Sequence, residues 1–218
     1  MTTDMPQNIV IVAVWTYWLS VVVMTVRSHI RYRTAAGGLP QTTRERWMWA
    51  VWMPAIILWQ VLPYLASRWS HPLFATPEFV RQYSAIQIVR WVAAIAAVLA
   101  FLLTIPCWLS MGRNWSMAIV PGKRSRLITK GMFARVRHPI YALSILLMGA
   151  TITVTATVTM TLVGALHIAM LCLKAINEET YLRRMHGQRY ADYCSQTGRF
   201  LPRILVFPAG RSKRKKAA

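Results

Sequence analysis

Two groups of ionisable residues in the C-terminal half of the chain have the types and spacing of a ligand site. The first consists of two cationic side chains, a proline and a phenol, namely Arg137, His138, Pro139 and Tyr141. The second is the pair Glu178–Glu179, two of only six acidic residues in the chain. A zwitterionic ligand would use both groups, because its carboxylate pairs with arginine or histidine and its ammonium with glutamate.

The segment between the two groups must bring them together. Residues 139–176 form an apolar stretch of 38 residues. As one helix it would be about 57 Å long, nearly twice the thickness of the hydrocarbon core of a bilayer. It is therefore expected to fold back as two antiparallel helices, with a turn near 154–158 that contains neither glycine nor proline. Pro139 suits the first turn of a helix, where its missing N–H costs nothing.

Each residue taken singly also has a simpler interpretation. Arg137 can be an anchor whose guanidinium reaches the membrane surface, and His138 an ordinary interfacial histidine. Glu179 is spaced to pair with Arg183 along one helix face. Two adjacent carboxylates at a membrane face are nevertheless costly without a task, and this favours a functional site.

The composition predicts an all-α integral membrane protein. The chain of 218 residues is 56% apolar and only 15% charged, against roughly 25% charged residues in a soluble domain. Its net charge of +20 does not indicate nucleic-acid binding, because the basic residues flank long apolar runs and so fit a role in membrane topology. The three cysteines are scattered without a CxxC pair, and no metal site is predicted.

The apolar runs and the charges between them predict about five transmembrane helices, the last two forming the hairpin. The first three runs are 9–26, 47–66 and 86–109. Connections rich in basic residues (27–46, 110–138 and the chain from Lys174 on) alternate with poor ones (67–85 and the hairpin turn). Because basic loops stay on the cytoplasmic side, the N-terminus is expected outside, and the C-terminus and the site in the cytoplasm. The membrane is an inner, plasma or endomembrane.

Six short motifs follow one another in order in the second half of the chain. They are Met111–Ser116, Leu127–Phe133, Arg137–Tyr141, Glu178–Leu182, His186–Tyr193 and Arg199–Pro202. The series resembles the isoprenylcysteine carboxyl methyltransferase family and its phospholipid methyltransferase relatives. The resemblance covers about residues 108–204. It suggests three parts: N-terminal transmembrane helices (1–107), a methyltransferase core with the cofactor site (108–204) and a basic tail (205–218).

The resemblance implies S-adenosylmethionine as the methyl donor, bound in a cytoplasmic, non-Rossmann pocket formed by the last helices. His138 and Arg137 would lie near the methionyl carboxylate or the adenosine, and Glu178 or Glu179 would accept the ammonium. The implied cofactor-binding residues are Arg137, His138, Pro139, Tyr141, Glu178, Glu179 and Tyr190. Catalytic roles are implied for Arg137, Glu178 and Glu179.

The implied acceptor is lipid-like or apolar, and membrane lipids are expected partners. Methylation of an isoprenylcysteine-type carboxylate is favoured, and N-methylation of an amino-lipid stays open. Such an acceptor is expected to enter sideways from the bilayer, past the aromatic residues Trp108, Trp115 and Tyr141, each of which would face lipid on one side and the polar site on the other.

Two other classes of protein remain as alternatives. Membrane sterol and enone reductases, which use NADPH, share the Arg-His-Pro-x-Tyr element. A small channel or transporter would need ionisable residues in mid-membrane. His167 is the exception within the predicted spans, and it is interpreted as a packed, hydrogen-bonded histidine.

Overall fold

The structure is a computed structural model that describes residues 4–32, 40, 42–112, 115, 117, 119 and 126–203. The described residues form helices and connecting loops, with one isolated parallel β-bridge between Val136 and Gly198. The predicted all-α class is therefore confirmed for them. The helices are α1 (Met5–Tyr32), α2 (Thr43–Arg68), α3 (Glu78–Gln82), α4 (Ser84–Met111), α5 (Pro139–Thr155), α6 (Val158–His186) and α7 (Gln188–Gln196), with a single 3₁₀ turn, η3 (Gly131–Ala134).

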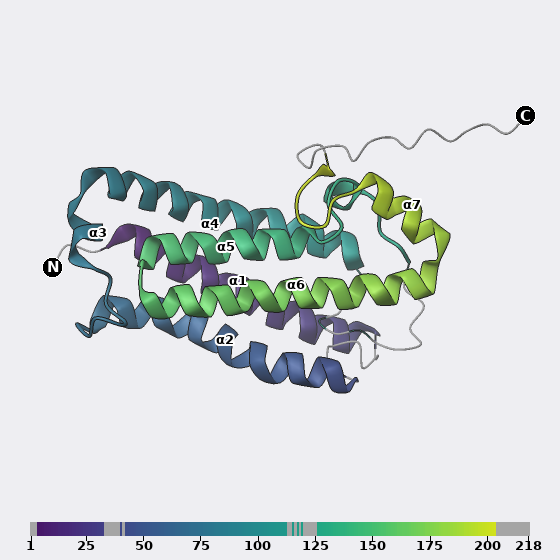
Figure 1. The fold of residues 1–218 in the computed structure, drawn as a ribbon, viewed down its shortest axis with the longest axis horizontal. Helices are drawn as coiled ribbons and strands as arrows, with labels where there is room; N and C mark the ends of the chain where they lie inside the picture. Colours follow the sequence, from purple (N-terminus) through teal and green to yellow (C-terminus); the bar gives the residue numbers. More distant parts are fainter. Residues whose placement is uncertain are drawn as a thin grey trace, which may run out of the picture.

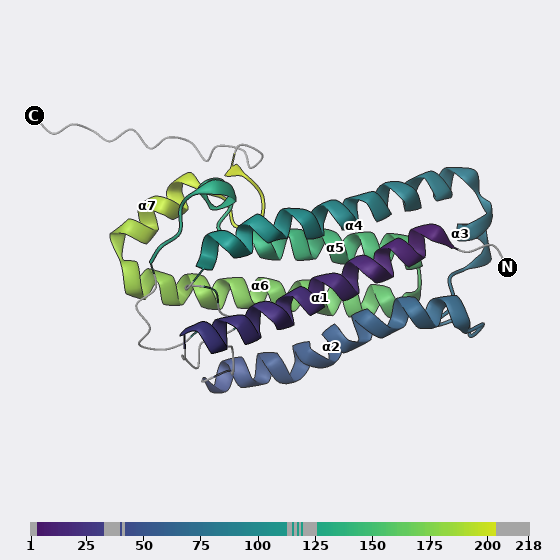
Figure 2. The ribbon, with the colours of Figure 1, turned by 180° about the vertical axis from the view of Figure 1, so that it is seen from behind.

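The five long helices lie side by side in one bundle (Figure 1). Successive long helices alternate in direction. The C-terminal ends of α1, α4 and α6 therefore meet the N-terminal ends of α2 and α5 at one end of the bundle. Helix α5 packs on α4 and α6, α2 packs on α6, and α1 contacts α4, α5 and α2. Figure 2, the view from behind, shows α1 and α2 in front of the hairpin formed by α5 and α6. The basic tail predicted for 205–218 lies outside the described residues.

Four of the helices are long and apolar enough to cross a membrane: Met5–Ser28 within α1, then α2, α4 and α6. This finding supports an integral membrane protein. Helix α5 is apolar but has only 17 residues, or about 26 Å. The five predicted helices are all present, and the number of complete crossings stays a prediction.

The predicted hairpin is confirmed, with its turn at Ala156 and Thr157 between α5 and α6. Ala156 ends α5 in the left-handed conformation, with φ 49° and ψ 36°. The Thr157 side chain caps α6 by accepting a hydrogen bond from the Met160 N–H at 3.2 Å. A threonine cap combined with one left-handed alanine thus replaces the glycine or proline that usually marks such a turn.

We expect Ala156→Gly to stabilise the protein. The left-handed conformation costs an alanine about 1–2 kcal/mol, and the extra freedom of glycine in the unfolded chain offsets about 0.5–1 kcal/mol of the relief. The net gain should be about 0.5–1 kcal/mol, measured as a higher thermal unfolding temperature in detergent. Ala50→Gly, at an exposed position inside α2, is the control and should lower that temperature. A lower temperature for both variants would show that the turn is not strained.

A buried arginine links three segments at the end of the bundle away from the basic connections. Arg90, in α4, is 1% exposed. Its guanidinium pairs with Asp4 at 2.6 Å and donates to the Val154 carbonyl at 3.0 Å. Asp4 thus compensates the charge of Arg90. The two contacts join the start of α1 to α4 and to the last turn of α5.

The middle of the bundle holds aromatic residues packed around His167, which is fully buried. The Trp52 indole N–H donates to His167 Nδ1 at 3.1 Å, and His167 Nε2 lies 3.1 Å from Ser144 Oγ. Because an indole can only donate, Nδ1 carries no proton, and Nε2 of the neutral ring donates to Ser144. The interpretation of His167 as a packed, hydrogen-bonded histidine is confirmed.

Candidate functional site

The N-terminus of α5 is held in place by the chain that follows α7. Helix α5 starts at Pro139, as predicted, so Arg137 lies before the helix and His138 occupies its N-cap. The Arg137 N–H donates to the Gly198 carbonyl at 2.8 Å, and the His138 N–H donates to the Arg199 carbonyl at 3.0 Å. These hydrogen bonds between residues 137–138 and 198–199 fix the backbone of Arg137 and His138.

Helix α7 folds back over this end of the bundle because the chain turns sharply at Gly187. Its φ of 52° and ψ of −128° lie in a region that favours glycine, and they let α6 end where α7 begins. The Tyr193 hydroxyl in α7 donates to the Phe133 carbonyl in η3 at 2.6 Å. Burial raises the pKa of Tyr193 to about 12, so the phenol keeps the proton that it donates.

Glu179 lies at the centre of a cluster of cations. It accepts hydrogen bonds from Arg137 Nε at 3.0 Å and from Arg199 Nε and Nη2 at 3.0 and 2.8 Å. His138 Nε2 lies 3.3 Å from its Oε1, within ion-pair distance but poorly aligned for a hydrogen bond. These hydrogen bonds raise the pKa of Arg199, which stays charged. Glu179 therefore pairs with residues distant in sequence and not with Arg183, as the simple helical interpretation would have it.

Glu178 has different surroundings, although it is the next residue. The Tyr141 hydroxyl donates to its Oε1 at 2.5 Å, and Lys174 Nζ lies 3.6 Å from the same oxygen. His138 Nδ1 lies 3.7 Å from its Oε2, and the His138 ring is stacked parallel to the Tyr141 ring with centroids 5.4 Å apart. The carboxylate keeps some exposure, 23% against 9% for Glu179.

A cavity of about 230 Å³ opens beside Glu178. Along α6 it is lined by Leu171, Lys174, Glu178 and Leu182, which span about 17 Å of one helix face. Six of the predicted site residues line it and Glu179 does not; the six are Arg137, His138, Pro139, Tyr141, Glu178 and Tyr190. The rest of the wall is largely aromatic and aliphatic, with Tyr17, Trp18, Trp52, Trp108, Trp115, Phe133 and Leu171.

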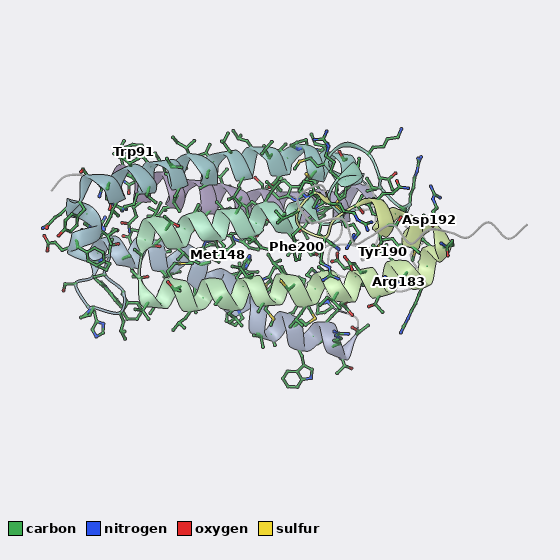
Figure 3. The ribbon with its side chains drawn as sticks, turned by 45° about the horizontal axis from the view of Figure 1, so that its top comes forward. Trp91, Met148, Arg183, Tyr190, Asp192 and Phe200 are labelled. Atoms are coloured by element: carbon green, nitrogen blue, oxygen red, sulfur yellow. The ribbon has the colours of Figure 1, made fainter. Side chains whose placement is uncertain are left out.

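Tyr190, in α7, is 1% exposed and lines the cavity. Figure 3 labels it with Arg183 and Phe200 at the same end of the bundle, opposite Trp91. Its hydroxyl has no well-aligned hydrogen bond within the described residues, although it interacts with the weakly polar Cys194 thiol. A buried hydroxyl that faces a cavity is a candidate ligand contact, because a buried polar group needs a partner.

The aromatic residues expected at the acceptor's entrance line the cavity, but two of them do not face lipid. Trp108 and Trp115 are only 3% and 5% exposed. The expectation that they have one side on the bilayer was wrong for these two, because both are buried within the protein; the Tyr17 ring of α1 lies 5.4 Å from that of Trp108.

Several wall residues were not predicted. Tyr17, Trp18 and Trp52 come from α1 and α2 and carried no sequence signal beyond their aromatic character. Lys174 had a usable signal, since it precedes Glu178 by four residues on the same helix face. Among the described residues, no group of three or more His, Cys, Asp or Glu side chains is placed to hold a metal ion.

Comparisons with known proteins find two curated relatives. The chain is 27% identical over 99 residues to the nickel-cobalt-cadmium resistance protein NccN of Alcaligenes xylosoxydans xylosoxydans. It is 26% identical over 99 residues to the cobalt-zinc-cadmium resistance protein CzcN of Cupriavidus metallidurans. Each match covers 45% of this chain and 46% of the relative, so the chain spans about half the length of these curated relatives.

The family comparison covers residues 91–184, from the first turns of α4 nearly to the end of α6. It therefore includes the start of α5 and the Glu178–Glu179 pair, around which the cavity is built. The matching model is that of the isoprenylcysteine carboxyl methyltransferase (ICMT) family, a family of methyltransferases. This match over somewhat less than half of the chain supports an assignment to the isoprenylcysteine carboxyl methyltransferase family.

Proposed function

We propose that this membrane protein transfers a methyl group from S-adenosylmethionine to a lipid-like or apolar acceptor in the cavity beside Glu178. The observation that carries the proposal is the wall of that cavity. A carboxylate, Glu178, the guanidinium of Arg137 and the imidazole of His138 line it together with an aromatic and aliphatic surface. A polar, zwitterionic donor and an apolar acceptor each find matching chemistry there, and the family assignment supports methyl transfer.

The residues present fit the donor. Its ammonium needs an anionic partner that is not already neutralised, and Glu178 meets this need better than Glu179, which two arginines already bind. Arg137 and His138 would hold the donor's carboxylate or adenosine. Tyr190 offers a buried hydroxyl to its polar atoms, and Tyr141 and Pro139 would form the adjoining wall.

The chemistry places few demands on the protein. When bound, the donor supplies an electrophilic methyl group. The chain's residues must align the acceptor with it and exclude water, and the buried aromatic wall is suited to both tasks. A carboxylate nucleophile needs no base and gains reactivity when stripped of its hydration. An amine would first have to lose a proton, with Glu178 as the candidate base. Methylation of a carboxylate is the favoured reaction.

Glu179 has a positioning role in this proposal. It joins α6 to Arg137 at the start of α5 and to Arg199 after α7. It therefore holds in place the segments that carry Arg137, His138 and Tyr190, and acts on the donor only through them.

The proposal is tested with the purified protein in detergent. We expect saturable binding of S-adenosylmethionine, competed by S-adenosylhomocysteine and not by NADPH. Incubation with methyl-labelled donor and lipid extracts should then yield a labelled lipid or lipid-like product. Binding of NADPH without S-adenosylmethionine would favour the reductase class instead, and binding of neither would overturn the proposal.

We also propose that the N-terminus lies outside and the cavity end of the bundle in the cytoplasm. The helix ends that flank the basic connections 27–46 and 110–138, and the end of α6, all lie at that end of the bundle. A reporter fused at the C-terminus should therefore read cytoplasmic, and one inserted within 67–85 should read external. Both reporters on one side of the membrane, or the reverse orientation, would contradict this topology.

A further inference from the structure

A second hollow, separate from the cavity beside Glu178, lies between the end of α6, helix α7 and the segment that follows α7. It is a groove of about 520 Å³. It shares only Arg137 with the cavity beside Glu178. Of its nine lining residues none is acidic and four are arginines, which come from four different segments: Arg137, Arg183, Arg199 and Arg203. We call it the arginine groove.

The arginines of the groove differ in how they are engaged. Arg137 and Arg199 share Glu179, at 3.0 and 2.8 Å, and Arg137 also donates to the backbone carbonyl of Thr197. Arg183 and Arg203 are exposed, and neither guanidinium forms an ion pair or a hydrogen bond with the described residues. The four arginines therefore share one carboxylate, which leaves an excess of positive charge and two unused guanidinium groups.

The chain has no further acidic side chain for the groove. All six acidic residues belong to the described part of the chain, and Glu179 is the one that contacts a groove arginine. Asp192, in α7, accepts a hydrogen bond from Gln188 at 2.8 Å and does not line the groove. The other four have partners elsewhere in the structure: Asp4, Glu45, Glu78 and Glu178. The anion that neutralises the groove must therefore come from outside this chain.

We infer that the arginine groove binds the phosphate of an anionic phospholipid head group. The planar fork of a guanidinium matches two oxygens of a phosphate, and it binds that group by two parallel charged hydrogen bonds. Arg183 and Arg203 offer two such forks from opposite sides of α7 in the chain. A water molecule takes up about 30 Å³, so the groove has room for a head group and not only for a single small ion. The inference does not depend on the proposed methyl transfer.

The depth of the groove along α6 favours a lipid as the source of the phosphate. Arg183 lies 25 residues after the first residue of α6, Val158, which corresponds to about 35 Å across a membrane at an average tilt of about 20°. The hydrocarbon core is about 30 Å thick, and the head groups extend it to about 40–45 Å. With Val158 at one edge of the core, Arg183 is level with the head groups at the other edge. Leu201, between two groove arginines in the chain, is 59% exposed and offers an apolar contact to an acyl chain.

Lipid binding at the groove should also stabilise the fold. Arg199 belongs both to the groove and to the cluster around Glu179, which joins the segment after α7 to the start of α5. A ligand that binds only the folded protein raises its stability in proportion to the logarithm of its concentration. The unfolding temperature is therefore a second measure of binding, independent of any enzyme activity.

The test uses the whole protein in an uncharged detergent and compares two double variants. The groove variant combines Arg183→Gln with Arg203→Gln. The control variant combines Arg184→Gln with Arg189→Gln, which removes two exposed arginines of α6 and α7 that do not line the groove. Both lower the net charge by the same amount. The probes are phosphatidylglycerol, phosphatidylcholine with the same acyl chains, and inorganic phosphate. Native mass spectrometry measures bound lipid, and thermal unfolding is measured alongside.

We expect the wild-type protein to bind phosphatidylglycerol in preference to phosphatidylcholine and to unfold at a higher temperature in its presence. The groove variant should bind phosphatidylglycerol at least about tenfold more weakly, the lower end of the effect of losing a charged hydrogen bond. It should also lose the rise in unfolding temperature. The control variant should stay within about threefold of the wild-type affinity, because salt at 0.15 M screens exposed charges more than about 8 Å apart.

Three results would overturn the inference. Equal binding of the two lipids would show that the charge of the head group is not recognised. An equal loss of affinity in the groove and control variants would attribute binding to the overall positive field of the protein. Inorganic phosphate that stabilises the wild-type protein as much as phosphatidylglycerol at the same concentration would assign the groove to a soluble anion. Should the groove variant fail to fold, Arg203→Gln alone is compared with Arg189→Gln alone under the same criteria.

Discussion

Glu179→Gln is expected to destabilise the protein by about 3 kcal/mol. Removing one partner of a buried ion pair costs about 3–5 kcal/mol, because the other partner stays buried and unpaired. The Glu179 and Arg137 side chains are only 9% and 13% exposed. The lower end of the range applies because Arg199, with a side chain that is 40% exposed, can be hydrated after the change. Thermal unfolding in detergent should move down by roughly 6–12 °C.

Two further variants sharpen this prediction. Glu78→Gln removes an exposed carboxylate in α3, at the other end of the bundle, and should leave the unfolding temperature nearly unchanged. Adding Arg199→Gln to Glu179→Gln removes one of the two unpaired cations and should restore part of the lost stability. If Glu179→Gln unfolds at the wild-type temperature, the cluster does not hold the N-terminus of α5 and the segment after α7 together.

Glu178→Gln is expected to weaken the binding of S-adenosylmethionine by about 10- to 150-fold. The glutamine keeps the shape of the side chain and an oxygen that can accept the hydrogen bond from Tyr141, but it removes the charge proposed to meet the donor's ammonium. An ionic hydrogen bond contributes about 1.5–3 kcal/mol, which corresponds to this range of affinity. Titration with labelled donor measures the change directly.

The stability of Glu178→Gln separates a binding role from a structural one. Glu178 is only loosely paired, with Lys174 at 3.6 Å and His138 at 3.7 Å. Its unfolding temperature should therefore stay much closer to the wild-type value than that of Glu179→Gln. Normal donor affinity in Glu178→Gln would remove this carboxylate from the site. A large loss of stability with unchanged affinity would make it a structural residue like its neighbour.

The positions of the helices followed from the sequence to a large extent. Long apolar runs set α1, α2 and α4, and the length of 139–176 required a hairpin whatever its turn residues were. The turn at Ala156 and Thr157 had no glycine or proline to mark it, yet it fell within the predicted 154–158 because the thickness of the bilayer limits the length of each helix. Pro139 marked the start of α5 because the first turn of a helix is where a proline's missing N–H costs nothing.

The site could be predicted only in part. The ordered motifs pointed to both ends of the hairpin and to Tyr190, and six of the named residues line the cavity. The sequence offered no means of distinguishing Glu178 from Glu179. Their difference depends on Arg199, 20 residues further along the chain, which reaches Glu179 once α7 has folded back at Gly187.

By itself, therefore, the sequence determined that the chain is an apolar helical protein. It also determined that basic and acidic residues meet at the open end of one hairpin, and it predicted that this end lies in the cytoplasm. These properties follow from hydropathy, length and charge, which are local quantities. Only the tertiary structure decided which carboxylate is neutralised, which faces the cavity, and that Lys174 and the aromatic residues of α1 and α2 complete its wall. Those outcomes depend on contacts between segments far apart in the chain, where a rotation of about 100° between successive residues of α6 gives Glu178 and Glu179 different neighbours.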